Sequence, residues 1–368
     1  MMPFEKKGVA VIHALATCPN MIAVPFGEPI EVIDDLYAVR VPLPHNPLKA
    51  INSYFVLDGE RTTIIDVGFN HPACKQALDD ALAALGRTWD GVQLVFTHSH
   101  PDHTGNLDRI YRPGMELYGN IHSFQEVKNL LTQQEQVFTY YLEQAASPAQ
   151  RAAATASEAA DGTAGGGLHV SAELLPVASM PQVQYLQDGD ELRLGRFTFE
   201  VVETPGHDPW HICLYERAQR IMIVGDHVLE RITPSVAAWL PTCDALAEFL
   251  ASLQKVAGYE ADLVLPAHGV PFSGLGARVA QLIAHHETRL EEIYGLVAAG
   301  HAGLIDISSH AQWRYPDWAS WALDQKFFSM GETMAHLIHL VSEGTLRQTI
   351  CGKEFRFEVA QGWRCDGR

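Results

Sequence analysis

The stretch "VQLVFTHSHPDHTGN", residues 92–106, places three histidines and one aspartate within six positions, directly after an apolar run. The apolar run predicts a buried strand, and the residues that follow it predict a strand-to-helix loop. Residues two apart in an extended segment point the same way, so His98 and His100 can present their imidazoles to one point. Asp102 and His103 come where the chain turns and can face a second point close by. Four such residues do not complete a site, so other parts of the chain must supply partners.

Length and composition limit the possible classes of protein. The chain has 368 residues, of which 47% are hydrophobic and 19% charged, as in a soluble enzyme with one large or two ordinary domains. Its formal net charge of −18 disfavours binding to phosphate backbones and to anionic membranes. The sequence contains no apolar run long enough to predict a membrane span. We therefore expect a small-molecule substrate as the partner, and neither nucleic acid nor a membrane.

The cysteines and the N-terminal segment indicate the cellular compartment in which the protein is expected. The six cysteines are scattered without CxxC pairs, which is typical of buried cysteines in a reducing compartment. Lys6 and Lys7 precede "GVAVIHALATC", residues 8–18, which resembles a weak signal peptide. However, this apolar run is short, contains His13 and is followed by no clean cleavage site. We expect a cytoplasmic protein.

Strand and helix signals alternate through most of the chain. Short apolar runs bounded by turn residues predict three early strands, at residues 36–43, 51–59 and 61–68. Residues 71–86 are apolar at helical spacing and end at Gly86, which predicts a helix. The alternation continues to "YEADLVLPAHG", residues 259–269. This pattern predicts an α/β protein whose sheets are covered by helices.

Two segments interrupt the alternation. From about 120 to 180 the chain is helical and then rich in alanine and glycine, and residues 152–167, "AAATASEAADGTAGGG", are expected to be mobile at their glycines. From about 277 the chain is largely helical. It closes with a helix ended at Gly344 and a hairpin that turns at Gly352-Lys353, which is the outline of a winged-helix module. The predicted divisions are an N-terminal extension, 1–29; a catalytic domain, 30–276, with a helical insertion at about 120–180; and a C-terminal helical, winged-helix-like domain, 277–368.

The insertion carries an apolar stripe at helical spacing. Its members share one face of the predicted helix and are Phe124, Val127, Leu131, Phe138 and Tyr141. One interpretation is a lid over the site that favours substrates with an apolar portion. The other is that the stripe packs on the core or forms the seam of a homodimer. The sequence leaves both open.

Three later loops supply further candidate ligands. His207 follows the apolar strand in "FEVVETPGHDPWH", Asp226 follows that in "RIMIVGDHVL", and His268 follows that in "DLVLPAHGVPF". Each comes after a strand and a turn, which is how a site assembles at one edge of an α/β fold. Any one of them taken alone could be an ordinary loop residue. Together with the opening stretch they predict a metal site, because imidazole and carboxylate suit zinc, iron or manganese.

The ordered motifs HxHxDH, TPGH, GD after a strand and AHG resemble those of the metallo-β-lactamase fold superfamily, over about residues 30–275. The resemblance implies an α/β fold of αββα sandwich type. It also implies two divalent metal ions, zinc first, with iron or manganese as alternatives. One ion would be held by His98, His100 and His207, and the other by Asp102, His103 and His268, with Asp226 bridging the two.

The resemblance implies a binuclear metal-dependent hydrolase in which a metal-bridging hydroxide attacks an acyl carbonyl of a thioester, ester or lactone. The expected catalytic residues are Asp226, which would fix the metal separation, and Asp102, which would ligate and take up a proton. The C-terminal part resembles that of a subfamily with a winged-helix-like extension. Two alternatives stay open: a metal-dependent nuclease of the same fold that cleaves RNA or other phosphodiesters, and a non-catalytic ligand-binding member. The acidic balance disfavours the first and the intact ligand set the second.

Other conspicuous residues are assigned supporting roles. Asp66 matches an acid near the site in this family and is expected to orient a ligand. His211 and His227 either support the ligands through hydrogen bonds or are simply buried. His286 and His336 lie on predicted helices, away from any ligand loop, and are expected to be surface or packing residues.

Overall fold

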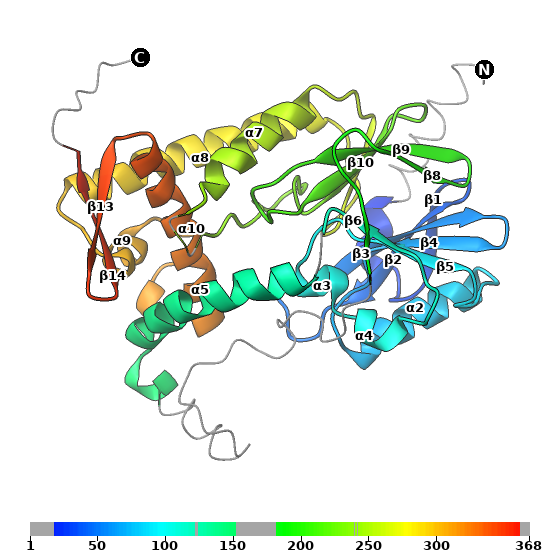
Figure 1. The fold of residues 1–368 in the computed structure, drawn as a ribbon, viewed down its shortest axis with the longest axis horizontal. Helices are drawn as coiled ribbons and strands as arrows, with labels where there is room; N and C mark the ends of the chain where they lie inside the picture. The colour runs from blue at the N-terminus through cyan, green and yellow to red at the C-terminus, as the bar shows by residue number, and fades with distance from the viewer. Residues whose placement is uncertain (1–17, 122–123, 152–181, 239, 241, 361–368) are drawn as a thin grey trace. The chain divides into compact units, whose positions relative to one another are not determined.

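The computed structural model describes residues 18–121, 124–151, 182–238, 240 and 242–360 (Figure 1). Most of the segment that resembles a signal peptide and the whole Ala/Gly-rich stretch 152–167 lie outside these described residues. The described residues form two compact units. Unit 1 holds those within Met1–Lys128, Ser171–Pro234 and Leu250–Gln281, and unit 2 those within Asn129–Val170, Ser235–Phe249 and Leu282–Arg368.

Unit 1 contains a seven-stranded sheet built from the N-terminal part of the chain. In spatial order its strands are β1 (Pro29–Ile33), β2 (Leu36–Pro42), β3 (Ala50–Asp58), β4 (Arg61–Ile65), β5 (Val92–Val95), β6 (Leu117–Gly119) and β7 (Gln184–Tyr185). Strands β1 to β4 pair antiparallel, and β4 to β7 pair parallel. The three early strands predicted from the sequence are confirmed as β2, β3 and β4.

A second, five-stranded sheet completes the core of unit 1. Its spatial order is β12-β11-β10-β9-β8, with bounds β8 Glu191–Leu194, β9 Phe197–Glu203, β10 Ile212–Glu216, β11 Ile221–Gly225 and β12 Leu263–Pro266. One buried apolar cluster joins the two sheets, with Val56 and Ile65 from the first and Phe199, Leu214 and Leu265 from the second. Because each sheet buries one face in the same core, the two sheets form a sandwich.

Helices cover the first sheet and connect the strands to the site loops. Helix α2 (Pro72–Ala84) packs against β2, close to the predicted range 71–86, and the short helices α3 (Pro101–Thr104) and α4 (Leu107–Ile110) follow β5 (Figure 1). The short 3-10 helix η1 (Cys18–Ala23) precedes β1. The predicted α/β class and its two-sheet, helix-covered architecture are confirmed.

Unit 2 is mainly helical. Three helices, α5 (Phe124–Ala145), α7 (Ala245–Ala257) and α8 (Leu275–Ala298), each pass from one unit into the other. The remaining elements of unit 2 are α9 (Leu304–His310), η3 (Trp318–Ser320), α10 (Leu323–Ser342), β13 (Leu346–Cys351) and β14 (Glu354–Val359). The chain leaves α10 at Gly344, whose φ is +76°, and β13 and β14 pair as a hairpin around Gly352-Lys353, as predicted. The helical C-terminal region is therefore confirmed, while its winged-helix class and the predicted domain boundaries stay predictions.

The apolar stripe of the insertion packs within the units. Phe124 is buried against Phe96 in unit 1, with ring centroids 6.2 Å apart. In unit 2, the ring of Phe138 lies 5.2 Å from that of Phe327. Tyr141 stacks on Phe355 at 6.1 Å. These contacts support packing within the units, while the lid and the homodimer seam stay predictions.

No helix among the described residues is both long enough and apolar enough to cross a membrane.

Candidate metal centre

The candidate ligands all follow the ends of strands in unit 1. His98 and His100 follow β5, and Asp102 and His103 lie on α3, the first turn after it. The other three follow strands of the second sheet: His207 comes after β9, Asp226 after β11 and His268 after β12. The structure thus brings together residues up to 170 positions apart (98 to 268).

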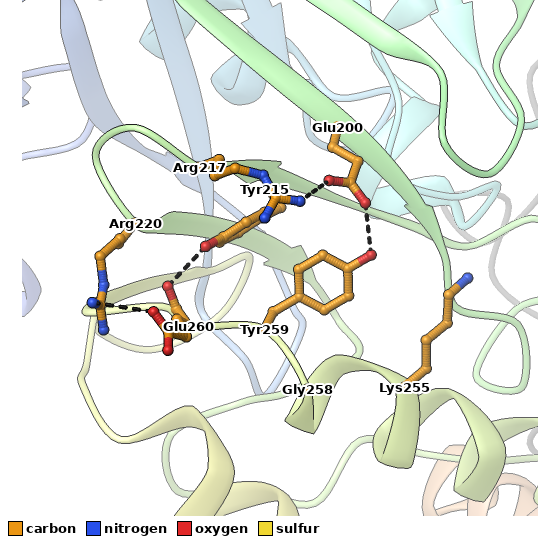
Figure 2. A pocket seen from close by; sticks show the side chains of 8 residues that line it. All are labelled: Glu200, Tyr215, Arg217, Arg220, Lys255, Gly258, Tyr259 and Glu260. Carbon is orange, nitrogen blue, oxygen red and sulfur yellow. Dashed lines mark hydrogen bonds and ion pairs between the residues drawn. The ribbon is translucent and has the colours of Figure 1, made fainter.

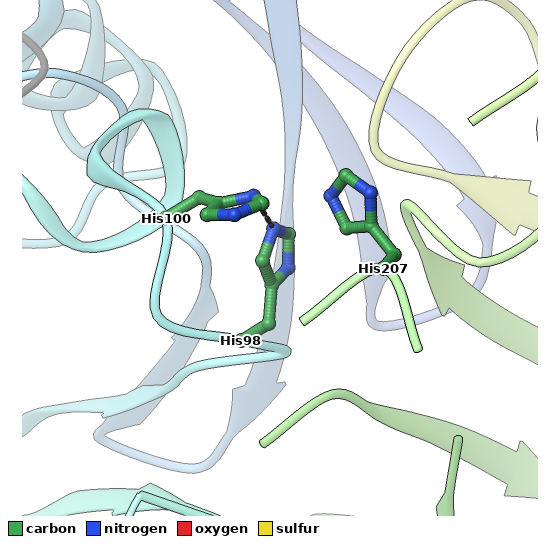
Figure 3. Close-up of side chains that lie close together, drawn as sticks. All are labelled: His98, His100 and His207. Atoms are coloured by element: carbon green, nitrogen blue, oxygen red, sulfur yellow. Dashed lines mark hydrogen bonds between the residues drawn. The ribbon is translucent and has the colours of Figure 1, made fainter. Parts of the chain in front are cut away.

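The first set, His98, His100 and His207, presents three imidazoles to one point (Figure 3). Their potential ligand atoms all lie within 4.8 Å of one another. Nε2 of His98 is 3.0 Å from Nδ1 of His100, and the rings of His100 and His207 are 4.6 Å apart. Burial, followed by the neighbouring imidazoles, lowers the pKa of His98 well below its ordinary value. A neutral imidazole is the form that binds a metal.

The second set, Asp102, His103 and His268, also has its potential ligand atoms within 4.8 Å of one another. Nε2 of His268 is 3.3 Å from Oδ2 of Asp102, and Nε2 of His103 is 3.9 Å from the same oxygen. Two imidazoles and one carboxylate form a donor set that suits a divalent transition metal.

Asp226 lies between the two sets. Its Oδ2 is 3.6 Å from Nε2 of His207, in the first set, and 3.7 Å from Nε2 of His103, in the second. Its Oδ1 is 3.4 Å from Nε2 of His268. This position is the one expected of a bridging carboxylate, although the roles of the seven residues as ligands stay a prediction.

Buried polar atoms at the centre have no well-aligned hydrogen-bond partner. They are Nε2 of His103, Nε2 of His268 and Oδ1 of Asp226. Leaving a buried polar group unsatisfied costs about 1–3 kcal/mol, so native proteins rarely do so without a reason. Because these three atoms face one another across the centre, bound cations would satisfy them. The residues present therefore fit a metal site.

Hydrogen bonds behind the second set fix which nitrogen faces the centre. Nδ1 of His103 is 2.8 Å from Oδ2 of Asp66, which is the contact expected if Asp66 orients this histidine. Nδ1 of His268 is 2.8 Å from the carbonyl oxygen of Ala50. Since each Nδ1–H donates outward, each Nε2 lone pair is directed to the centre. The loop that carries His268 is itself held by Asn52, whose side chain donates to the carbonyls of Pro266 and Gly269.

The charges of the second set depend on one another. Burial alone would lower the pKa of His103, but Asp66, Asp102 and Asp226 raise it well above its ordinary value. Burial has the same effect on His268, and the acids raise its pKa to about 10. Burial would raise the pKa values of Asp102 and Asp226, but His103 and His268 lower both. The pKa of Asp102 falls to about 2, and that of Asp226 lies well below its ordinary value. The carboxylates around His103 and His268 thus favour positive charge at this point, either as protons on the two imidazoles or as bound cations in place of those protons.

His211 supports the loop that carries Asp226. The backbone N–H of Asp226 donates to Nε2 of His211 at 3.1 Å, and Nδ1 of His211 is 2.7 Å from Oγ1 of Thr204. Gly225 permits this approach, because a Cβ at that position would lie 2.6 Å from Nε2 of His211. Of the two interpretations of His211, the hydrogen-bonding role is confirmed. His227 is buried, with its ring 5.9 Å from that of His211.

One link between ligand loops was not predicted from the sequence. Oγ of Ser99 donates to Oδ2 of Asp208, and Oδ1 of Asp208 accepts from the backbone N–H of Trp210. Ser99 lies between His98 and His100, and Asp208 directly follows His207, so this bond joins the two loops of the first set. Both residues stand inside the quoted motifs, but no local pattern reveals a contact over 109 positions.

A polar pocket of about 400 Å³ also lies in unit 1, at the ends of β10 and β11 opposite to Asp226 (Figure 2). Its charged groups are paired with one another or with neighbours. Arg217 is 3.0 Å from Glu200, which also accepts from the hydroxyl of Tyr259 at 2.8 Å. Arg220 is 3.3 Å from Glu260. Because these charges already neutralise one another, we assign no ligand to this pocket.

Comparison with known proteins agrees with this architecture. The family model described as "Metallo-beta-lactamase superfamily" matches residues 47–268, more than half of the chain. A two-sheet α/β fold whose strand-end loops carry histidines and aspartates in this order defines a metal-dependent hydrolase. The chain belongs to the metallo-β-lactamase superfamily.

Individual relatives extend the likeness beyond the matched segment. The Bacillus subtilis protein described as "Probable metallo-hydrolase YqjP" is 24% identical over 323 residues, which cover 84% of this chain and 93% of that protein. The crystal structure of a metallo-beta-lactamase family protein from Thermus thermophilus has a TM-score of 0.70 and 25% identity, and the match covers 89% of this chain and 100% of that one. The Emericella nidulans protein named "Atrochrysone carboxyl ACP thioesterase" is 25% identical over 255 residues, which cover 69% of this chain and 62% of that protein. The predicted family, fold and hydrolase class are therefore confirmed.

Proposed function

We propose that the chain is a binuclear metal-dependent hydrolase that acts on the carbonyl of small acyl compounds, thioesters first and then esters or lactones. The observation that carries this proposal is the position of Asp226, whose two carboxylate oxygens lie 3.4–3.7 Å from histidines of both three-residue sets. A carboxylate so placed suits a bridge between two cations. Zinc is the first candidate, with iron or manganese as alternatives, because imidazole and carboxylate donors suit all three.

Two divalent ions held there would supply Lewis acidity and lower the pKa of bound water toward about 7. The residues of the chain divide the remaining tasks. Asp226 keeps the two ligand sets at a fixed separation. Oδ2 of Asp102 is 3.3 Å from Nε2 of His268, so this carboxylate borders the centre and is the candidate to take up the proton of the attacking water. The low pKa of Asp102, about 2, keeps that carboxylate ionised near neutral pH, which is the form that binds a cation.

The acyl class is supported by the relatives and by charge. A thioesterase is named among the proteins that this chain resembles over 69% of its length. The formal net charge of −18 opposes the approach of RNA, whose cleavage is the main alternative within the fold. A small acyl substrate is more compatible with this negative net charge than RNA is.

The test is a substrate screen with the metal-loaded chain. Acyl-thioesters, lactones, β-lactams and RNA are each assayed with the unaltered protein, with His100→Ala and with His45→Asn as a matched control. His45 is an exposed loop residue of unit 1 with φ +61°, a conformation that asparagine tolerates. We expect thioester or ester hydrolysis that is lost in His100→Ala and kept in His45→Asn. RNA cleavage lost in His100→Ala, with no acyl hydrolysis, would reverse the assignment.

A further inference from the structure

A second group of histidines and an acid lies in unit 2, away in sequence from all seven residues of the centre. His301 follows α8, Asp306 lies in the first turn of α9, and His310 is the last residue of α9. Asp306 and His310 are four positions apart, so they share one face of the helix. The three side chains are partly exposed, by 27%, 46% and 52%. An ion could therefore reach them from solvent.

The three side chains converge. Nδ1 of His301 is 3.0 Å from both carboxylate oxygens of Asp306, and Nδ1 of His310 is 3.3 Å from Oδ1 of Asp306. The two imidazole rings lie 4.2 Å apart, with 34° between their planes. All three residues offer a potential ligand atom within 4.8 Å of the others.

We propose that His301, Asp306 and His310 form a separate surface site for one first-row divalent ion of the zinc, nickel or copper type. Such an ion binds imidazole nitrogen and carboxylate oxygen at about 2.0–2.2 Å, so neighbouring ligands on a tetrahedral ion are about 3.4 Å apart. The nitrogen–oxygen separations of 3.0 and 3.3 Å need to widen by only a few tenths of an ångström. Water completes the coordination on the exposed side.

The donor set also determines which ions bind. Two imidazoles and one carboxylate favour Zn²⁺, Ni²⁺ or Cu²⁺, whereas Mg²⁺ and Ca²⁺ require mainly oxygen ligands. Nδ1 of His310 is also 2.8 Å from the backbone carbonyl of Asp306, so binding through this nitrogen exchanges that hydrogen bond for coordination. Binding is therefore reversible and weaker than at a closed structural site.

The site lies beside the point where the terminal hairpin joins the helices of unit 2. The carbonyl of Ala302 accepts a hydrogen bond from the backbone N–H of Phe357 at 2.9 Å, and Gly303 forms a β-bridge with Arg356. An ion that ties His301 to α9 would hold this loop in the conformation that β14 contacts. We expect such an ion to raise the melting temperature of the chain.

Equilibrium dialysis against Zn²⁺ tests the proposal on the full chain with its centre already loaded. The unaltered protein should bind one equivalent more than His310→Asn and one more than Asp306→Asn, while His45→Asn should match the unaltered protein. This difference does not depend on how many ions the centre holds, because the centre is the same in every variant. Equal zinc content in all four proteins, or a loss in His45→Asn as large as in His310→Asn, would overturn the proposal.

Chemical modification provides a readout that needs no variant. Zn²⁺ should slow the reaction of His301 and His310 with diethyl pyrocarbonate several-fold, as followed by peptide mass spectrometry, and Mg²⁺ should not. Unchanged reactivity in Zn²⁺, or equal protection by Mg²⁺, would also overturn it.

Discussion

Oδ2 of Asp66 lies 2.8 Å from Nδ1 of His103, and both side chains are buried. The same oxygen accepts the hydroxyl hydrogen of Thr97 at 2.7 Å, so Oγ1 of Thr97 can only accept from Nδ1 of His98, 3.1 Å away. Asp66 thus fixes the tautomer of His103 directly and that of His98 through Thr97. One carboxylate orients a histidine in each of the two ligand sets.

Asp66→Asn should weaken metal binding at the centre by about 10- to 100-fold, because loss of such a supporting acceptor has this effect in other metal sites. Oδ1 of Asp66 also accepts from the backbone N–H of Thr97 at 2.9 Å, so both carboxylate oxygens act as acceptors. Asparagine has only one acceptor oxygen and cannot keep all of these hydrogen bonds. Competition with a chelator measures the affinity. Asp58→Asn, at the exposed end of β3, is the control and should bind metal as the unaltered chain does. Equal affinity in Asp66→Asn would show that Asp66 does not orient the ligands.

The bond between Ser99 and Asp208 should couple the two loops of the first set. Burial raises the pKa of Asp208 above its ordinary value, and the hydrogen bonds from the hydroxyl of Ser99 and the N–H of Trp210 offset part of this rise. Ser99→Ala and Asp208→Ala should each destabilise the chain, and the double variant should cost less than the sum of the two, by about 0.5–3 kcal/mol. Urea unfolding of the three variants measures this difference. Strict additivity would mean that the bond contributes nothing to stability.

Tyr141 should contribute to stability rather than to substrate selection. Its hydroxyl accepts from the backbone N–H of Phe355 at 2.7 Å, and burial raises the pKa of Tyr141 to about 12. Tyr141→Phe removes the acceptor from a buried N–H and should cost about 1–3 kcal/mol. The neighbouring Tyr140→Phe, whose hydroxyl bond to Glu354 is 3.5 Å long and exposed, is the matched control and should cost little.

The same two variants also test the alternative that the insertion selects substrates. Relative rates on short-chain and long-chain acyl substrates should not change in Tyr141→Phe, while thermal melts reveal the loss of stability. A changed chain-length preference at an unchanged melting temperature would restore the interpretation of the insertion as a lid.

A buried histidine pair should make the chain sensitive to acid. Nδ1 of His286 is 3.2 Å from Nε2 of His336, and burial, followed by the neighbouring charges, lowers the pKa of each to about 3. In the unfolded chain the pKa is about 6.5. Between these two values the unfolded chain binds more protons than the folded chain. The free energy of unfolding therefore has its full value above about pH 6.5 and decreases as the pH falls toward about 3.

His336→Gln removes one of the two groups that take up a proton on unfolding, and it keeps a polar partner for His286. At pH 5 its free energy of unfolding should depend less steeply on pH, by up to about 1.4 kcal/mol per pH unit. Urea unfolding at several pH values measures the slope, and above pH 7 the slopes of the two proteins should coincide, which is the internal control. Identical slopes at pH 5 would contradict the assignment.

Local patterns predicted the elements and the ligand loops because each depends on neighbouring residues. Alternation predicted β2 and β3, and the segment from His98 to His103 predicted a metal site only together with the later strand-end loops of His207, Asp226 and His268. The link from Ser99 to Asp208 and the pairing of His286 with His336 join positions 109 and 50 residues apart, and these depend on how the sheets and helices pack. Periodicity also could not decide what the stripe around Tyr141 packs against, since an apolar face looks the same whatever covers it.

Metal titration with simultaneous assay tests the binuclear mechanism most directly. The metal-free chain, carrying His310→Asn so that the surface site adds nothing, is titrated with Zn²⁺ while acyl-thioester hydrolysis and bound zinc are measured. We expect no turnover without metal and a rise that ends at about two equivalents, with no rise in the same chain carrying Asp226→Ala. Full turnover in the metal-free protein, or a plateau at about one equivalent or less, would contradict this mechanism.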